Sequence, residues 1–242
     1  MHGTPMFDVR IVRKVFVSAD GTRRDVLRDI AFSIAPGEAI ALLGASGIGK
    51  STTLRILLGL DTAFDGSVRH GIGRIGAMFQ EARLLPWLTI ADNLRLVVTD
   101  GMPSPDIDAL LRMVRLPNAG DLYPRQLSLG MGRRAALARA LAVSPDVLVL
   151  DEPFAALVTV VERWTHDTEA IVLLATHDLT QALKLASRVL VLAGTPATLA
   201  ADIVIPPDIH LATRAGLHEK LAATFSFFQP GANGLPSDPA KD

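Results

Sequence analysis

The chain has 242 residues, of which 49% are hydrophobic, so it can bury the core of one large domain and is not globally disordered. Its 24 Lys and Arg nearly balance 25 Asp and Glu, which gives no support to wholesale nucleic-acid binding. The absence of cysteine excludes disulfide bonds and thiolate metal sites. There is neither a secretory signal nor a run near the roughly 20 apolar residues of a membrane helix, so we expect a cytoplasmic protein that reaches a membrane only through a partner.

The N-terminal 37 residues are predicted to form antiparallel β structure. Ile30, Phe32 and Ile34 alternate with small or polar neighbours, as in a half-buried strand. The next apolar run, at 39–43, is continuous instead, which is typical of a strand buried on both faces of a parallel sheet. We therefore expect an antiparallel β lobe followed by an α/β core.

Residues 44–51 match the pattern G-x-x-x-x-G-K-[ST] at every fixed position, between a buried strand and a helical stretch. In this pattern backbone N–H groups surround a phosphate, and the positive end of the following helix adds to the attraction. Lys50 is expected to reach the β- and γ-phosphates, and the Ser51 hydroxyl to bind Mg²⁺. The nucleotide-binding residues predicted here are Gly44, Ala45, Ser46, Gly47, Ile48, Gly49, Lys50, Ser51 and Thr52.

The middle of the chain is predicted to be mainly helical. Residues 89–98 have apolar side chains at helical spacing, a Pro-rich segment ending at Asp106 opens a second helix, and residues 130–142 are rich in helix formers. We expect a helical subdomain over about residues 87–142, inserted into the α/β core. The whole domain is expected to span 1–228.

Strand-like runs return at 147–150, 171–175 and 189–192, and the last residues, 229–242, have the composition of a flexible tail. The first of these runs ends in two adjacent carboxylates, Asp151 and Glu152. Such a pair at a strand end is by itself more often a solvated turn. Beside a phosphate loop it predicts a hydrolysis site, in which Asp151 lies near Mg²⁺ and Glu152 polarises the attacking water.

In this order the motifs resemble the ABC ATPase family over roughly residues 7–225. Gln80 resembles the family's glutamine that contacts Mg²⁺ or the attacking water, and His177 resembles its histidine that contacts the γ-phosphate. Phe16 stands where the family has an aromatic that stacks on adenine. The resemblance implies a P-loop NTPase fold that binds ATP and Mg²⁺. It implies catalytic roles for Glu152, His177 and Gln80, and metal-binding roles for Ser51, Gln80 and Asp151.

Residues 127–131, Leu-Ser-Leu-Gly-Met, and the Arg- and Ala-rich segment after them resemble the signature that separates ABC ATPases from other P-loop proteins. In the family this segment caps the nucleotide held by the other copy of a head-to-tail dimer. The resemblance implies that Ser128 and Gly130 bind nucleotide in this way. A P-loop kinase, a third and more distant alternative, would leave the signature and His177 unexplained.

Residues 79–94 resemble the ATPases of nitrate, sulfonate and taurine importers, in which the segment around Trp87 lies near the membrane partner. Trp87 is expected either to be exposed for such docking or to lie in the core. The resemblance implies a membrane-spanning permease, an extracytoplasmic solute-binding protein and no nucleic-acid partner. It implies a peripheral protein on the cytoplasmic face of the inner (plasma) membrane that powers import of a small oxyanion.

Three features depart from the family pattern. Leu129 replaces the signature's first glycine, and Val158 replaces an aspartate that couples the two sites of the dimer. Only 24 residues lie between Glu152 and His177, so the helix around 160–167 is predicted to be a stub. Either the chain tolerates these changes, or it binds ATP and hydrolyses it poorly. A soluble ABC ATPase acting on nucleic acid or ribosomes is a further alternative, although neither a second ATPase domain nor a long inserted arm is evident.

Overall fold

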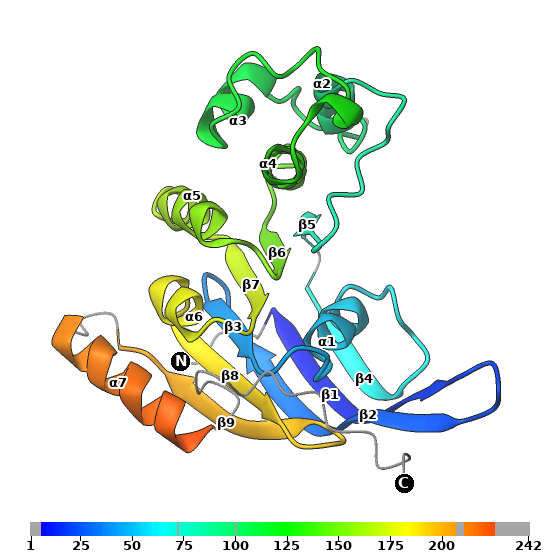
Figure 1. Cartoon of the computed structure of the whole chain (residues 1–242), viewed down its shortest axis with the longest axis vertical. Helices are drawn as coiled ribbons and strands as arrows, with labels where there is room; N and C mark the ends of the chain where they lie inside the picture. The colour runs from blue at the N-terminus through cyan, green and yellow to red at the C-terminus, as the bar shows by residue number, and fades with distance from the viewer. Residues whose placement is uncertain (1–5, 72, 100, 207–210, 226–242) are drawn as a thin grey trace, which may run out of the picture.

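The computed structural model describes residues 6–71, 73–99, 101–206 and 211–225, with the side chains of 211–214 left out (Figure 1). The strands are β1 (Phe7–Val17), β2 (Arg23–Ile34), β3 (Ala39–Leu43), β4 (Asp65–His70), β5 (Ile75–Met78), β6 (Val147–Asp151), β7 (Ile171–Thr176), β8 (Arg188–Ala193) and β9 (Thr198–Val204). The helices are α1 (Lys50–Leu57), α2 (Ile90–Arg95), α3 (Ile107–Met113), the 3₁₀ turn η1 (Pro124–Gln126), α4 (Leu129–Leu141), α5 (Ala155–Thr165), α6 (Leu179–Leu185) and α7 (Leu211–Thr224). The predicted tail at 229–242 lies outside the described residues.

The N-terminal strands form an antiparallel sheet in the order β2-β1-β4. β1 and β2 pair from Phe7 opposite Ile34 to Val17 opposite Arg23, and the alternate residues Phe7, Val9 and Ile11 are buried. This confirms the expected antiparallel lobe. β4, which is polar and largely exposed, was not predicted because its sequence lacks an apolar alternation.

The second sheet has the order β5-β6-β7-β3-β8-β9, in which β5 to β8 and β3 run parallel and β9 is an antiparallel edge. The core strands β6 and β7 are buried along their whole length, as their continuous apolar runs predicted. Because β6, β7 and β3 are neighbours, the loops that follow them emerge side by side at one edge of the sheet. In parallel sheets ligands bind at this edge.

Helices α2, α3 and α4 lie between β5 and β6 in sequence and form the part of the molecule drawn at the top of Figure 1. The three predicted helices are present, each near its expected start. Thr89, Asp106 and Ser128 cap them, each accepting a hydrogen bond from a backbone N–H of the first turn. The caps explain why these helices begin where the sequence indicates.

Helix α5 contradicts the predicted stub. It spans Ala155–Thr165, 11 residues or about three turns. The short distance between Glu152 and His177 is accommodated by a short connection, since only residues 152–154 separate β6 from the helix. As a result Val158 lies within α5 and is fully buried.

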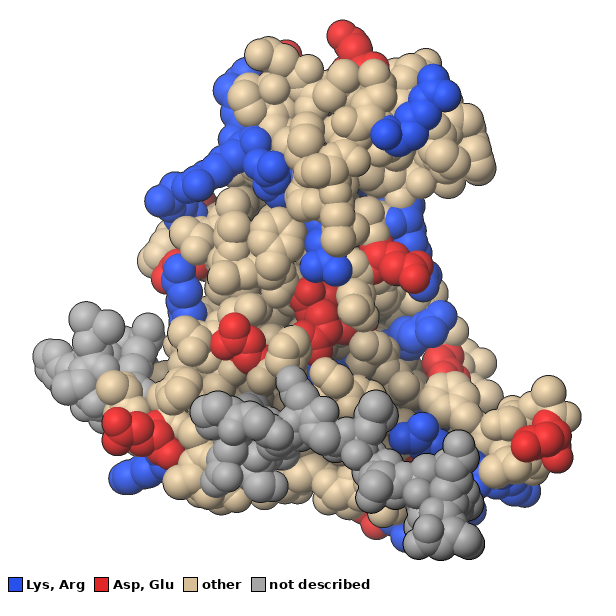
Figure 2. Space-filling model, in the orientation of Figure 1, with Lys and Arg blue, Asp and Glu red and all other residues tan. Residues whose placement is uncertain are grey.

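The surface of the molecule carries both signs of charge. Figure 2 shows Lys and Arg distributed over several parts of one face, with Asp and Glu among them. Within the described part of the chain, no helix is both long enough and apolar enough to cross a bilayer.

Candidate nucleotide-binding site

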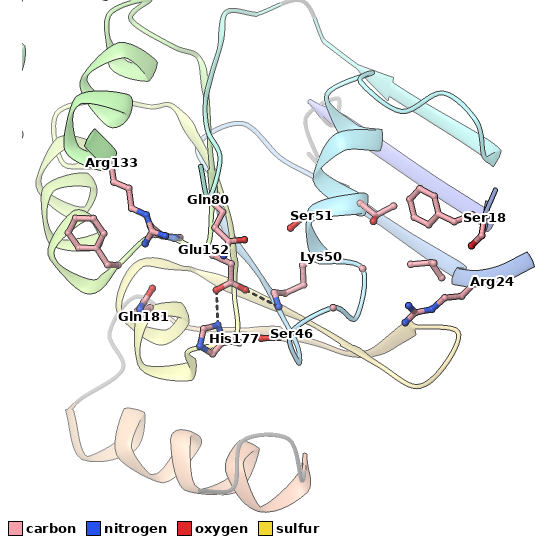
Figure 3. Close-up of a pocket in the computed structure, with 17 residues that line it drawn as sticks. Ser18, Arg24, Ser46, Lys50, Ser51, Gln80, Arg133, Glu152, His177 and Gln181 are labelled. Atoms are coloured by element: carbon pink, nitrogen blue, oxygen red, sulfur yellow. Dashed lines mark hydrogen bonds and ion pairs between the residues drawn. The ribbon is translucent and has the colours of Figure 1, made fainter. Parts of the chain in front are cut away.

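The loops after β3, β6 and β7 open onto a cavity of about 730 Å³ (Figure 3). A cavity of this size is in the range of small-molecule sites. Residues from β1, β2, α4 and α6 complete its wall. The lining residues are Phe16, Ser18, Arg24, Val26, Ser46, Gly47, Gly49, Lys50, Ser51, Thr52, Gln80, Arg133, Glu152, Pro153, Phe154, His177 and Gln181.

The phosphate loop holds Lys50 at the first position of α1. Gly49 caps this helix with a φ of 119°, which is in the region that favours glycine. The Lys50 ammonium donates to the carbonyls of Gly44 (2.9 Å) and Ala45 (3.0 Å) and pairs with Glu152 Oε1 at 3.0 Å. All three of its hydrogens therefore have partners within the chain.

Ser51 and Asp151 meet across the loop. The Ser51 hydroxyl donates to Asp151 Oδ1 at 2.9 Å, and Asp151 is 4% exposed. Burial raises the pKa of the Asp151 carboxyl above its ordinary value, and repulsion from Glu152 raises it further. A hydroxyl and a carboxylate, with the Gln80 amide in the same cavity wall, are the oxygen donors that Mg²⁺ prefers. The residues present thus fit this ion.

The Glu152 carboxylate lies between the Lys50 ammonium group and the His177 imidazole ring. One carboxylate oxygen contacts Lys50, and the other lies 2.7 Å from Nδ1 of His177. The backbone of Glu152 has a φ of 50°, and its N–H donates to the carbonyl of Ala175 at 2.8 Å. A non-glycine residue in this region is strained, and such strain is typical of functional sites. This turn directs the carboxylate into the cavity (Figure 3).

The opposite end of the cavity is formed by β1 and β2. Phe16 is 46% exposed, and the Lys14 ammonium lies 4.8 Å from the centre of its ring. Arg24 is the cross-strand partner of Phe16 and also lines the cavity. An exposed ring at this end is free to stack on a flat aromatic group.

The structure brings most of the predicted site residues together and separates others. Gly44 and Ala45 do not line the cavity, but their carbonyls accept hydrogen bonds from Lys50. Asp151 does not line it either and accepts a hydrogen bond from Ser51. Ile48 also does not line the cavity. Ser128 and Gly130 lie at the start of α4 and do not line the cavity of their own chain, so their role across a dimer stays a prediction.

Sequence reasoning missed seven lining residues: Ser18, Arg24, Val26, Arg133, Pro153, Phe154 and Gln181. Arg133 follows the signature by two residues, and Gln181 lies one helical turn after His177. Their place in the cavity depends on how α4 and α6 pack against the sheet, which no local pattern predicts. The β1 and β2 residues had no local pattern that distinguishes them from other lobe positions.

A phosphate loop after β3, facing two consecutive carboxylates at the end of β6 in the same parallel sheet, defines a P-loop ATPase. The model of the ABC transporter family matches residues 27–155. The chain belongs to this family.

Individual relatives agree with that assignment. The chain is similar to the aliphatic sulfonates import ATP-binding protein SsuB 2 of Burkholderia lata, with 42% identity covering 95% of this chain and 90% of the relative. SsuB of Bacillus subtilis is 40% identical, over 78% of this chain and 80% of its own. The dimeric bacterial ABC transporter cassette MJ0796 has a TM-score of 0.72 at 25% identity, over 83% of this chain and 99% of the cassette. A post-hydrolysis state of the same cassette, bound to ADP and Pi, has a TM-score of 0.73 at 24% identity over the same shares.

Proposed function

We propose that the chain is the ATP-hydrolysing subunit of an ABC importer for aliphatic sulfonates, or for a related small oxyanion such as nitrate or taurine. The observation that carries the hydrolytic role is Glu152, held between Lys50 and His177 at the end of a nucleotide-sized cavity. Both SsuB relatives are aliphatic sulfonates import ATP-binding proteins, which supports import of sulfonates.

In the proposed reaction the chain's own residues bind ATP along the cavity. Phe16 stacks on the adenine, and the loop amides and Lys50 bind the phosphates. Because the γ-phosphate competes with Glu152 for Lys50, ATP binding frees the Glu152 carboxylate. It then orients the attacking water and accepts its proton, while His177 donates a hydrogen bond to the γ-phosphate.

Ser51, Asp151 and Gln80 are the residues proposed to hold Mg²⁺. When bound, this ion neutralises negative charge on the β- and γ-phosphates. The hydrogen bond between Ser51 and Asp151 keeps both oxygen donors in place before the metal enters.

The proposal includes a head-to-tail dimer, in which Ser128 and Gly130 contact nucleotide held by the second copy. At this helix start Leu129 is 74% exposed. Burying such an apolar side chain against a partner is favourable. The exposed N-terminal N–H groups of α4 suit a phosphate.

The membrane-spanning permease is proposed to dock on the segment around Trp87, which is 70% exposed. Asn93 fixes this segment, because its buried amide accepts from the N–H of Leu85 and donates to the carbonyls of Leu85, Leu88 and Thr89. An exposed Trp on a firmly held loop suits a docking contact. The chain would then work on the cytoplasmic face of the inner membrane, with an extracytoplasmic solute-binding protein delivering the solute.

The test is ATP hydrolysis by the purified chain. Glu152→Gln should lower the rate by about 10²–10⁴-fold, because the neutral amide cannot accept the water's proton. Glu81→Gln is the matched control, since the Glu81 side chain is 83% exposed and should leave the rate unchanged. Binding of ATP without turnover by the natural chain would favour the alternative of a degenerate subunit. Loss of alkanesulfonate uptake in cells carrying Glu152→Gln, with nitrate uptake intact, would identify the solute class.

A further inference from the structure

Two buried side-chain polar atoms have no hydrogen-bond partner in the described part of the chain, and both belong to residues of the nucleotide cavity. They are Nε of Arg133, on α4, and Oε1 of Gln181, on α6. Figure 3 shows both side chains at the Glu152 end of the cavity, away from Ser18 and Arg24. A buried polar group without a partner is costly, so both side chains would gain by rearranging to reach a hydrogen-bond partner when the cavity is filled.

Arg133 differs from the other arginines of its helix. Arg134 donates to the carbonyls of Gly130 and Arg115, and Arg139 donates to those of Ala82 and Arg83. These two guanidinium groups therefore link α4 to other segments of the chain by hydrogen bonds. The Arg133 side chain makes no hydrogen bond or ion pair to any described residue, and it points into the cavity (Figure 3).

The charges around Arg133 suit an anion. Lys50 is already engaged by Glu152 and by two carbonyls, and the Glu152 carboxylate is divided between Lys50 and His177. Arg133 is thus a cation at this end whose charge is not matched within the described chain. Guanidinium binds phosphate oxygens through two parallel N–H donors.

Gln181 does not compete for this role. Its Nε2 donates to Asp178 Oδ2 at 3.0 Å, which fixes Oε1 as the free acceptor because a carboxylate only accepts. A phosphate oxygen cannot donate to it, whereas a water molecule can. The two unpaired atoms therefore call for different partners, an anion at Arg133 and a water at Gln181.

We propose that Arg133 binds the terminal phosphate of ATP held by its own subunit, and that it makes the site prefer ATP over ADP. The order of residues along the cavity supports this choice of phosphate. Arg24, the cross-strand partner of Phe16, lies at one end, Lys50 of the phosphate loop lies in the middle, and Arg133 lies beyond Lys50 (Figure 3). The inference rests on the proposed function, since it assumes that ATP occupies this cavity with its base at Phe16.

The experiment measures the affinities of the purified chain for ADP and for a non-hydrolysable ATP analogue by calorimetry, for the natural chain and for Arg133→Gln. The variant should bind the ATP analogue about 10- to 100-fold more weakly, the effect of one charge-assisted hydrogen-bond pair, and ADP less than about twofold more weakly. Arg133→Lys should retain part of the preference for the ATP analogue over ADP, because lysine keeps the positive charge but lacks the two parallel N–H donors of the guanidinium group. Arg24→Gln, at the opposite end, should weaken both nucleotides by similar factors.

Equal weakening of both nucleotides in Arg133→Gln, or no change in either, would overturn the proposal. A fall in the melting temperature of nucleotide-free Arg133→Gln would also count against it, since the side chain would then support the fold. The proposed function fails in a different way, namely if the natural chain binds neither nucleotide. A natural chain that binds both, with an unchanged preference in Arg133→Gln, would contradict only the inference about Arg133.

Discussion

The phosphate loop and the connection from Glu152 to His177 meet in one cavity, yet they relate to the sequence differently. In the loop the pattern is complete, and Lys50 and Ser51 contact Glu152 and Asp151, the two carboxylates that the sequence placed at the same site. Their contacts with phosphate and Mg²⁺ stay predictions. In the connection, Val158 stands where the resemblance implies an aspartate of a dimer contact, yet it is a core residue of α5. At Val158 the position in the motif therefore did not predict the surroundings of the residue.

The largest expected loss of stability comes from a substitution in α5, and it tests whether Val158 is a core residue. Val158→Asp would place a carboxylate at a fully buried position of α5, and we expect the free energy of unfolding to fall by about 3–5 kcal/mol. Denaturant unfolding measures the loss. Ala156→Asp is the control, because Ala156 is exposed in the first turn of the same helix and should change stability by less than about 0.5 kcal/mol. A stable Val158→Asp chain would show that α5 does not bury this position.

A smaller loss of stability is expected from substitutions in the phosphate loop. At Gly49 the φ is 119°, and an added Cβ would lie 2.5 Å from a methyl of the buried Leu27. Gly49→Ala should therefore cost about 2–4 kcal/mol through backbone strain and overpacking. Gly47→Ala, with a φ of 74° and open space around the new methyl, should cost only about 1 kcal/mol. Equal losses in the two variants, measured by thermal unfolding, would contradict the close packing at Gly49.

What could be predicted from the sequence depends on whether a feature is set by a local pattern or by packing between distant segments. The buried strands, the three capped helices and the phosphate loop depend on local patterns, namely continuous apolar runs, N-cap residues and fixed glycines. β4 and β9 could not be found locally, since β4 is polar and both are edge strands that are defined by their pairing partners. The same holds for Arg133 and Gln181, whose place in the cavity depends on how α4 and α6 pack. The stub prediction was wrong because the segments on either side of α5, residues 152–154 and 166–170, are short enough to leave room for a helix of 11 residues.

The smallest expected change in stability comes from the charge of the Asp151 carboxyl group. Because burial raises the pKa of this carboxyl, the folded chain holds its proton over a pH range in which the unfolded chain has released it. The contribution of Asp151 to stability is therefore most favourable at low pH and is lost as the pH rises from the ordinary value of 3.8 to the raised one. At neutral pH the buried charge destabilises the ligand-free chain.

Asp151→Asn should thus raise the melting temperature of the nucleotide- and metal-free chain at pH 7, and the gain should disappear below pH 3.8. Asp146→Asn should have the opposite sign. The pKa of Asp146 is lowered mainly by the hydrogen bond from the N–H of Arg74, so its charged form stabilises the fold above the ordinary pKa. Melting curves of both variants against pH measure the two signs. A loss of stability in Asp151→Asn at pH 7 would mean that Lys50 and Arg55 outweigh burial, and that the carboxylate holds the loop in place without its metal.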